Sequence, residues 1–289
     1  MKRTICNSLA DKLYSRGFGN RDGKCIELSW VEFAYLSEKG ILDYDFEDVV
    51  KKASREVPNF DILFIVYRDL RERGYVLKDR GNYFMGRKNY SMAFYPLSDM
   101  DYFDVSEFVE KQYPLILSIV DFDGEVTYYL VDMVDPKGTY FKIPQEELNF
   151  EIYGKRAFVF TNLQDFENLT YGRNEGTWGH LSLLEIKYLA ENGVVEKNPQ
   201  VEGVYEIYKD LRDRGLIVKS GFKYGTHFRV YENSMEEHSK YLVHLISERE
   251  EIQKISRAVR VAHGVRKTLL LAHNLNGKIV YFSVSWIRP

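Results

Sequence analysis

The sequence predicts a mixed α/β protein built from two similar halves, each a small helical lobe followed by a lobe on a mixed sheet. Three observations support this: the chain repeats itself, each copy passes from helical to strand-like periodicity, and each copy ends in a hairpin signal. The matching segments are 28–42 with 181–195, 66–78 with 207–219, and 124–136 with 277–289. Segments 66–78 and 207–219 are separated by fewer residues than the other two pairs. The connection between the first and second matching segments is therefore shorter in the second copy.

Each copy predicts the same elements in the same order. The shared motif LSxxExxYLxExG has apolar residues at helical spacing and a terminal glycine, which predicts an amphipathic helix. A second helix ends in RDLRERG or KDLRDRG, whose charges indicate a solvated face. Runs rich in Val, Tyr and Phe then predict strands, and the dipeptides DG and NG predict the turns of a final hairpin.

The repeats set the predicted domain boundaries. The first copy covers residues 1–140 and the second 154–289, with 141–153 as the connection between them. Within the second copy we expect a helical lobe over about 154–220 and a sheet lobe over about 221–289.

Composition predicts a soluble globular protein, with 45% hydrophobic and 29% charged residues. No apolar run approaches the roughly 20 residues that cross a membrane, and the first residues lack the apolar core of a signal peptide. We therefore expect a cytoplasmic protein with no membrane partner. The two cysteines, Cys6 and Cys25, imply no disulfide framework and no zinc spacing, so neither a metal nor a cofactor is expected.

The net charge of −3 hides a strong asymmetry between the copies. Residues 252–289 carry seven Lys or Arg and no acid, whereas residues 99–136 carry ten acids and one base, Lys111. All six histidines also lie in the second copy. A positive cluster favours a polyanionic partner, usually RNA or DNA, and an acidic surface can dock against a basic one. The second copy is thus predicted to hold a site, and the first to be a scaffold.

The segments FRVYENSMEEHSKYLVH (228–244), SRAVRVAHGVRKTLLLAH (256–273) and IVYFSVSWIRP (279–289) carry a family resemblance. The chain resembles the archaeal tRNA-splicing endonucleases of the two-repeat, homodimeric type. The resemblance implies a nuclease-like catalytic lobe in the second copy and a degenerate first copy. It assigns the family's catalytic residues to Tyr231, His238 and Lys267, and its RNA-contacting arginine to Arg260. Arg288 is the candidate for a second such arginine.

These residue types suit RNA cleavage by the RNA's own 2′-hydroxyl. Such cleavage needs a base, an acid and positive charge on the phosphorane, roles that fit Tyr231, His238 and Lys267 in turn. The products would be a 2′,3′-cyclic phosphate and a 5′-hydroxyl, without a metal. A tyrosine base needs neighbouring cations to lower its pKa. Helical spacing would place Arg260 and Lys267 on one face, with Gly264 between them allowing a phosphate to come close.

The first copy is expected to be inert. Tyr95 ends a strand-like run there but no histidine follows it, and Tyr113 stands where the second copy has Lys267. Near the C-terminus, Trp286 is a candidate for stacking on bases, whereas Tyr281 is expected to fill the hairpin core. The other histidines are expected to be structural (His180, His227 and His244) or to lie near the basic cluster without a fixed role (His263 and His273).

The resemblance also implies partners. The substrate would be the bulge-helix-bulge of a precursor tRNA, and two cuts would require a homodimer. The acidic hairpin turn of the first copy, with Asp121, Asp123 and Glu125, would dock into a basic cleft of the neighbouring subunit. Two alternatives remain: a non-catalytic RNA-binding or assembly subunit, and a metal-dependent nuclease, for which the only hint is the spacing of Glu237 and Lys240.

Overall fold

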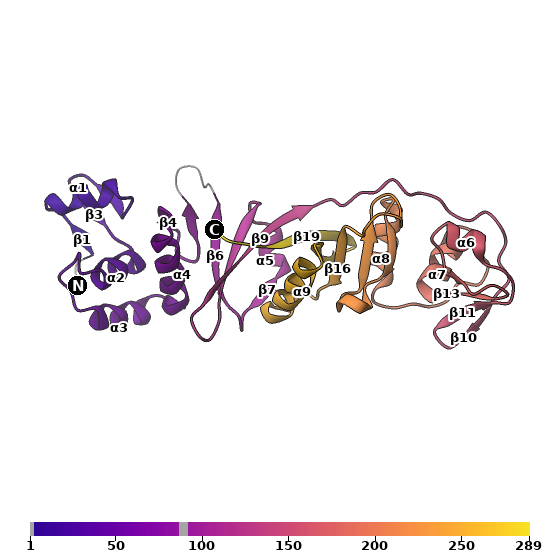
Figure 1. Ribbon diagram of the computed structural model, residues 1–289. Coiled ribbons are helices and arrows are strands. Elements are labelled where there is room, and N and C mark those ends of the chain that lie inside the picture. Colours follow the sequence, from indigo (N-terminus) through magenta and orange to yellow (C-terminus); the bar gives the residue numbers. More distant parts are fainter. Residues whose placement is uncertain (1–2, 87–91) are drawn as a thin grey trace. The chain divides into compact units, whose positions relative to one another are not determined.

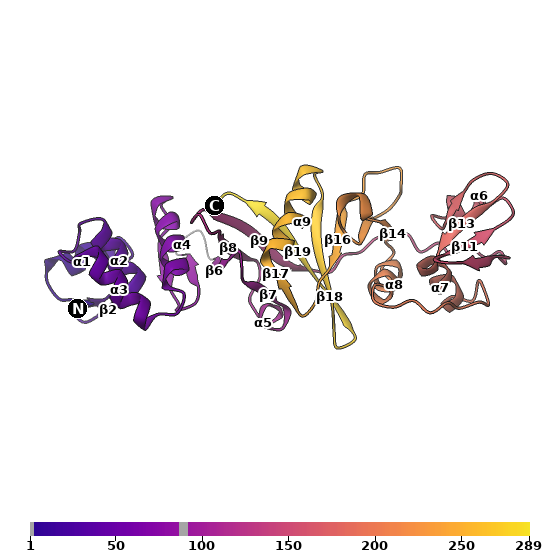
Figure 2. The ribbon, with the colours of Figure 1, turned by 90° about the horizontal axis from the view of Figure 1, so that it is seen from below.

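The computed structural model describes residues 3–86 and 92–289, which form two compact units (Figures 1 and 2). The first unit comprises Met1–Asp132, Arg249–Arg257 and Val284–Pro289, and the second comprises Met133–Glu248 and Ala258–Ser283. The units do not coincide with the two sequence copies, because two segments of the second copy belong to the first unit. The copies are therefore a division of the sequence, and the units a division of the structure.

The first unit begins with a small lobe of helices on a short sheet, coloured indigo to purple in Figure 1. Helix α2 forms where the motif predicts an amphipathic helix, and Ser29 and Glu32 form a reciprocal capping box that fixes its start. Helix α3 follows and has no counterpart in the second copy, which accounts for the longer connection in the first. The elements are β1 (Thr4–Ile5), α1 (Ser8–Ser15), β2 (Asn20–Asp22), β3 (Cys25–Glu27), α2 (Trp30–Glu38), α3 (Phe46–Glu56) and α4 (Phe60–Glu72).

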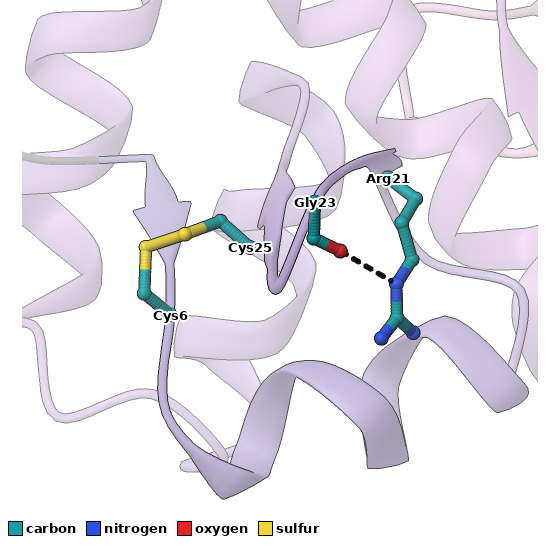
Figure 3. The surroundings of a disulfide bond; sticks show 4 residues. All are labelled: Cys6, Arg21, Gly23 and Cys25. Carbon is teal, nitrogen blue, oxygen red and sulfur yellow. Dashed lines mark hydrogen bonds between the residues drawn. A yellow bond between two sulfur atoms is a disulfide. The ribbon is translucent and has the colours of Figure 1, made fainter.

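A disulfide joins Cys6 to Cys25 in this lobe (Figure 3). The sequence implied no disulfide framework, so this expectation is wrong. The physical reason is strand register: β1 pairs with β3 so that Ile5 lies opposite Ile26, which brings the two cysteines next to each other. A spacing of 19 residues gave no sign of this pairing before the strands were placed.

The larger lobe of the first unit is a sheet with the strand order β9-β8-β6-β5-β4. Strands β6 and β8 are parallel, and the other pairs are antiparallel. A second, two-stranded sheet pairs β7 with β17. The elements are β4 (Leu77–Asp79), β5 (Phe84–Gly86), β6 (Ala93–Ser98), β7 (Tyr102–Asp104), α5 (Val105–Val109), β8 (Leu115–Val120), β9 (Val126–Val134) and β17 (Arg249–Glu251).

The second unit repeats this plan. Ser182 and Glu185 form the same capping box at the start of α7, and α7 lies beside β11 and β13 in both views. Its small sheet has the order β10-β11-β13-β12. The elements are β10 (Glu151–Tyr153), β11 (Arg156–Val159), α6 (Gln164–Asn168), β12 (Arg173–Asn174), β13 (Gly179–Ser182), α7 (Leu183–Glu191) and α8 (Tyr205–Asp213).

The larger sheet of the second unit has the order β14-β15-β16-β18-β19, again with one parallel pair, β16 and β18. The matching element order in the two copies confirms the predicted mixed α/β class. Among the helices described, none is both long and apolar enough to span a bilayer. The elements are β14 (Ile217–Ser220), η1 (Phe222–Tyr224), β15 (Phe228–Tyr231), β16 (Tyr241–Leu245), α9 (Ile252–Gly264), β18 (Thr268–Leu275) and β19 (Lys278–Ile287).

Candidate functional site

The sheet of the second unit brings the three catalytic candidates to one edge, which is formed by the ends of three neighbouring strands and not by an outer strand. Tyr231 is the last residue of β15, His238 lies just before β16, and Lys267 directly precedes β18. Because β16 runs antiparallel to β15 and parallel to β18, the end of β15 meets the beginnings of the other two strands. The backbone hydrogen bonds from Lys240 N to Val230 O and from Thr268 N to Lys240 O, both 3.0 Å, close this edge.

A direct contact ties Lys267 to the segment that carries His238. The half-buried Lys267 side chain donates from Nζ to the backbone carbonyl of Ser239, at 2.6 Å. His238 itself is exposed, whereas only 7% of Tyr231 is exposed. The guanidinium of Arg229, two residues before Tyr231 on the same strand face, lies 5.9 Å from the Tyr231 ring. The edge therefore holds an imidazole, a phenol and two cations.

Lys267 does not lie on helix α9, so the predicted shared face with Arg260 and Gly264 is wrong. The helix ends at Gly264, and Arg266 adopts the left-handed conformation, with φ 55°. Arg266 N then bonds His263 O at 3.0 Å and Lys267 N bonds Ala262 O at 2.9 Å. This double hydrogen bond is the usual way in which a helix ends and satisfies its last carbonyls. The chain must turn there to enter β18, so helical spacing does not reach Lys267.

Strand register also corrects the comparison with the first copy. Phe84 lies opposite Asp79 as Phe228 lies opposite Ser220, so the equivalent of Tyr231 is residue 87, which lies outside the described residues. Tyr95 is therefore not that equivalent. It belongs to β6, whose parallel pairing with β8 matches that of β16 with β18. The expectation was wrong because two strands, β5 and β6, follow each other in this part of the chain, and Tyr95 lies on the second of them.

The strand register also changes which residue of the first copy is equivalent to Lys267. Pro114, not Tyr113, directly precedes β8 as Lys267 precedes β18. The first copy thus has no lysine there, as the sequence analysis expected, although the residue is a different one.

The candidate RNA contacts fall into both units. Arg260 is an exposed residue of α9 in the second unit. Trp286 and Arg288 belong to the first unit, where the Arg288 guanidinium lies 4.9 Å from the Trp286 ring. Tyr281 is 1% exposed and donates to Asp210 at 2.7 Å, which confirms that it packs in the hairpin core. The roles of the other three in RNA binding stay predictions.

Local structural contacts involve His180, His227 and His244, as expected, and also His273, whose role the sequence left open. His227 accepts a hydrogen bond from Leu245 N at 3.1 Å, and its ring lies 5.0 Å from that of His244. The His180 ring lies 6.0 Å from the Trp178 ring. His273 bonds the Ile246 carbonyl at 3.0 Å and pairs with Glu248, also at 3.0 Å.

The acidic turn of the first unit, residues 121–125, is held by hydrogen bonds to one of its own carboxylates. Asp121 Oδ1 accepts hydrogen bonds from Asp123 N at 3.1 Å and Glu125 N at 3.0 Å. Asp121 therefore shapes the turn, while Asp123 and Glu125 present exposed charge. At the tip, Phe122 is 86% exposed.

A basic pocket in the second unit was also missed by sequence reasoning. It has a volume of about 500 Å³ and lies between the small lobe and the sheet. Its cationic residues come from four separate strands, so no local motif could have shown it. Those that line it are Arg156, Arg173, Lys219 and Arg229, together with His180 and His227.

The spacing of Glu237 and Lys240, which was the hint of a metal site, does not bring these two side chains together as a pair. Lys240 pairs with Glu232 at 2.7 Å, while Glu237 is exposed. Within residues 3–86 and 92–289, no group of three or more His, Cys, Asp or Glu side chains is arranged to hold a metal ion.

Comparison with known proteins places these features in context. Residues 201–281 match the model of the tRNA intron endonuclease catalytic C-terminal domain, and residues 4–52 match that of the N-terminal domain. The chain is 32% identical to a tRNA-splicing endonuclease of Methanosarcina mazei, covering 96% of this chain and 94% of that protein. It is 33% identical to one from Thermoplasma volcanium, covering 88% and 84%. One from Thermococcus onnurineus is 36% identical, covering 50% of this chain and 99% of that protein.

Proposed function

Because the chain belongs to the tRNA intron endonuclease family, we propose that it is an endoribonuclease that excises introns from precursor tRNA. Its substrate is the bulge-helix-bulge element, cut once in each bulge. The observation that carries the chemistry is the edge of the second unit's sheet, where Tyr231, His238 and Lys267 meet. Bulged nucleotides can be splayed out into such an edge, while the helix is recognised by its shape and backbone charge.

Cleavage proceeds through the RNA's own 2′-hydroxyl. Tyr231 takes the proton of that hydroxyl, and the 2′-oxygen forms a new bond to phosphorus. The bond from phosphorus to the 5′-oxygen breaks, and His238 gives this leaving oxygen its proton. Lys267 stabilises the charge on the phosphorane, held in place by its bond to the Ser239 carbonyl. The products are a 2′,3′-cyclic phosphate and a 5′-hydroxyl, and no metal ion takes part.

RNA binding extends from this edge to further side chains. Arg260 is exposed and free to meet a phosphate, since it has no hydrogen bond or ion pair within the described part of the chain. The stacked pair of Trp286 and Arg288 offers a planar surface to a bulged base. A cation on an aromatic face suits a nucleotide, which has both a ring and a charge.

Two copies of the chain act together as a homodimer. Two cuts need two sites, and a two-fold axis matches the pseudo-symmetry of the RNA element. The acidic turn of one subunit, with Asp121, Asp123 and Glu125, fits the basic pocket of its partner by charge. The exposed Phe122 at the tip would be buried in that contact.

Charge reversal tests the dimer. Asp123→Lys with Glu125→Lys should lower the mass measured by light scattering to that of one chain, because the turn keeps its shape through Asp121. The matched control is Glu146→Lys with Glu147→Lys, another pair of exposed acids close together in the chain. An unchanged mass in the first variant contradicts docking through the turn.

We place the enzyme in the cytoplasm, where its RNA substrate would be found. Fractionation of cells that express the tagged chain, with the RNA-cleaving activity followed through each fraction, tests this location. Recovery of the activity with membranes would contradict it.

The function itself is tested with a pair of RNAs. One contains the bulge-helix-bulge, and the other has the same sequence with both bulges closed into a continuous helix. The proposal expects two cuts in the first RNA, with cyclic-phosphate ends, and none in the second. Tight binding without cutting would favour a non-catalytic assembly subunit, and cutting only after addition of a divalent metal would favour a metal-dependent nuclease.

A further inference from the structure

The connection between β14 and β15 is longer than its counterpart in the first copy. Ser220 pairs with Phe228, which leaves residues 221–227 as the connection. In the first copy Asp79 pairs with Phe84, which leaves only residues 80–83. The catalytic copy therefore carries three more residues at this place. Its connection includes the short 3₁₀ turn η1, Phe222–Tyr224, with the sequence Phe-Lys-Tyr.

The longer connection is held rigidly. Gly221 N bonds the carbonyl of His227 at 3.0 Å, and Tyr224 N bonds the carbonyl of Gly221 at 2.8 Å. A Cβ added to Gly221 would lie 2.4 Å from Oγ1 of the buried Thr226 and 2.7 Å from the carbonyl carbon of Phe228, so only glycine fits there. The turn is thus a fixed feature of the fold, and the side chains that it presents have a defined direction.

The turn presents aromatic side chains that the core does not use. Phe222 is 88% exposed, and Lys223 places its ammonium 4.9 Å from the ring of the half-buried Tyr224. Leaving a phenylalanine ring in water gains the protein nothing, because burial of that ring would be favourable. A rigid, exposed aromatic residue in the copy that carries the candidate site points to a ligand with a flat apolar face.

The surroundings of the turn are positively charged. The pKa of the Tyr224 phenol lies below its usual value, first because the Lys223 ammonium hydrogen-bonds to it and also because of the charges of Lys223, Lys267 and Arg229. Positive charge beside exposed aromatic rings suits RNA, which has both phosphates and bases.

We propose that Phe222 and Tyr224, in the turn at the start of the strand that Tyr231 ends, form a stacking platform for a nucleobase of the bound RNA, with Lys223 contacting the adjoining phosphate. This assignment rests on the proposed function, since it gives that same site a further substrate-positioning element. Stacking recognises the face that all bases share, so the platform holds a splayed nucleotide without selecting its identity. The short connection of the first copy, which has no such turn, fits its scaffold role.

Binding and cleavage are measured on full-length Phe222→Ala with a bulge-helix-bulge RNA that carries 2-aminopurine at the bulge positions. Aromatic stacking on one base corresponds to a change in Kd of about tenfold or more. We expect Kd to rise by that factor and the fluorescence quenching on binding to be lost, with the rate at saturating enzyme little changed. Phe222→Trp should keep the affinity, and Phe222→Leu should behave like Phe222→Ala.

The matched control is Phe160→Ala, which removes another phenylalanine of the second unit that is 66% exposed. An unchanged Kd in Phe222→Ala, or full affinity in Phe222→Leu, would overturn stacking. A fall in the mass by light scattering would assign the ring to a protein contact instead. Quenching is read without cleavage, so wild-type protein that binds but does not cut would contradict the proposed function alone.

Discussion

The Lys267 ammonium donates to the backbone carbonyl of Ser239 at 2.6 Å, one residue beyond His238. This hydrogen bond joins the start of β18 to the segment before β16, two parts of the chain that are 28 residues apart. A lysine held in this way keeps its charge at one place, which is what stabilisation of a phosphorane requires. The contact also means that Lys267 has both a structural and a proposed catalytic role, and these must be separated by experiment.

Replacing Lys267 separates the two roles. Lys267→Ala removes one hydrogen bond, so the free energy of unfolding should fall by only about 1 kcal/mol. The rate constant of single-turnover cleavage should fall by about 10²- to 10³-fold, because positive charge on the transition state is lost. Lys240→Ala is the control, since this exposed lysine of the same edge is paired with Glu232. Equal losses of rate in both variants would contradict a specific role for Lys267.

The cap of α9 gives a prediction about stability. Arg266 has φ 55°, a conformation that costs a non-glycine residue about 1 kcal/mol or more. Arg266→Gly should therefore raise the thermal midpoint of unfolding, or leave it unchanged if the greater freedom of the unfolded chain offsets the gain. Arg257→Gly, an exposed site within the same helix, should lower the midpoint, although it removes the same charge. A lower midpoint for Arg266→Gly would contradict the description of this cap.

Two glutamates at equivalent positions, Glu32 and Glu185, should make the stability of the fold respond to pH in opposite directions. Glu32 and Glu185 accept the same backbone hydrogen bonds, from Gly19 and Ser29 and from Gly172 and Ser182. Burial raises the pKa of Glu32 above its ordinary value near 4.5, and the hydrogen bonds only partly oppose this. Burial also acts to raise the pKa of Glu185. There, however, Lys219 at 3.3 Å and the hydrogen bonds together hold the pKa below the ordinary value.

The difference between the two glutamates can be measured as the loss of stability in Glu32→Gln and in Glu185→Gln at different pH. A carboxyl with a lowered folded pKa stabilises the fold above its unfolded pKa and loses that contribution as pH falls through the folded value. The cost of Glu185→Gln should therefore shrink from about pH 6 to about pH 3. Glu32 has a raised folded pKa, so it favours the fold when protonated, and the cost of Glu32→Gln should grow over the same range. Unfolding measured by circular dichroism at each pH checks both, and slopes of the same sign would contradict the assignment.

The disulfide predicts a local loss of stability. In a chain-entropy description, a bridge that closes a loop of this length stabilises the fold by about 3 kcal/mol. Cys6→Ser with Cys25→Ser should lower the thermal midpoint of the first unit by the corresponding amount. The cleavage rate at low temperature should not change, because the catalytic candidates belong to the second unit. If reducing agent lowers the midpoint of the double variant as much as that of the wild type, the bridge does not account for the loss.

Much of the fold followed from local sequence. The amphipathic helices that begin at Trp30 and Leu183 and the two hairpin turns are fixed by residues a few positions apart, so patterns of spacing predicted them. The Cys6–Cys25 bridge and the counterpart of Tyr231 depend on which strands pair and in what register. Spacing alone does not give that information, so the predictions about these two features were wrong.

The sequence named the candidate residues of the site but did not predict their arrangement. The resemblance named Tyr231, His238 and Lys267, and the structure brings them to one sheet edge. The expected helical face failed because Lys267 follows the helix cap at Arg266. The basic pocket and the exposed ring of Phe222 stayed hidden, since the pocket is assembled from separate strands and the ring is one of 18 phenylalanines in the chain.

The most direct test of the central claim uses a bulge-helix-bulge RNA in which sulfur replaces the 5′-oxygen that leaves at each cut. Sulfur leaves without a proton, so it removes the need for a general acid. In EDTA, His238→Ala should cut the ordinary RNA about 10²- to 10⁴-fold more slowly than wild type, yet cut the sulfur RNA at nearly the wild-type rate. Tyr231→Phe should remain slow on both. If His238→Ala stayed equally slow on the sulfur RNA, or if wild type needed added metal, the proposed roles at this sheet edge would be contradicted.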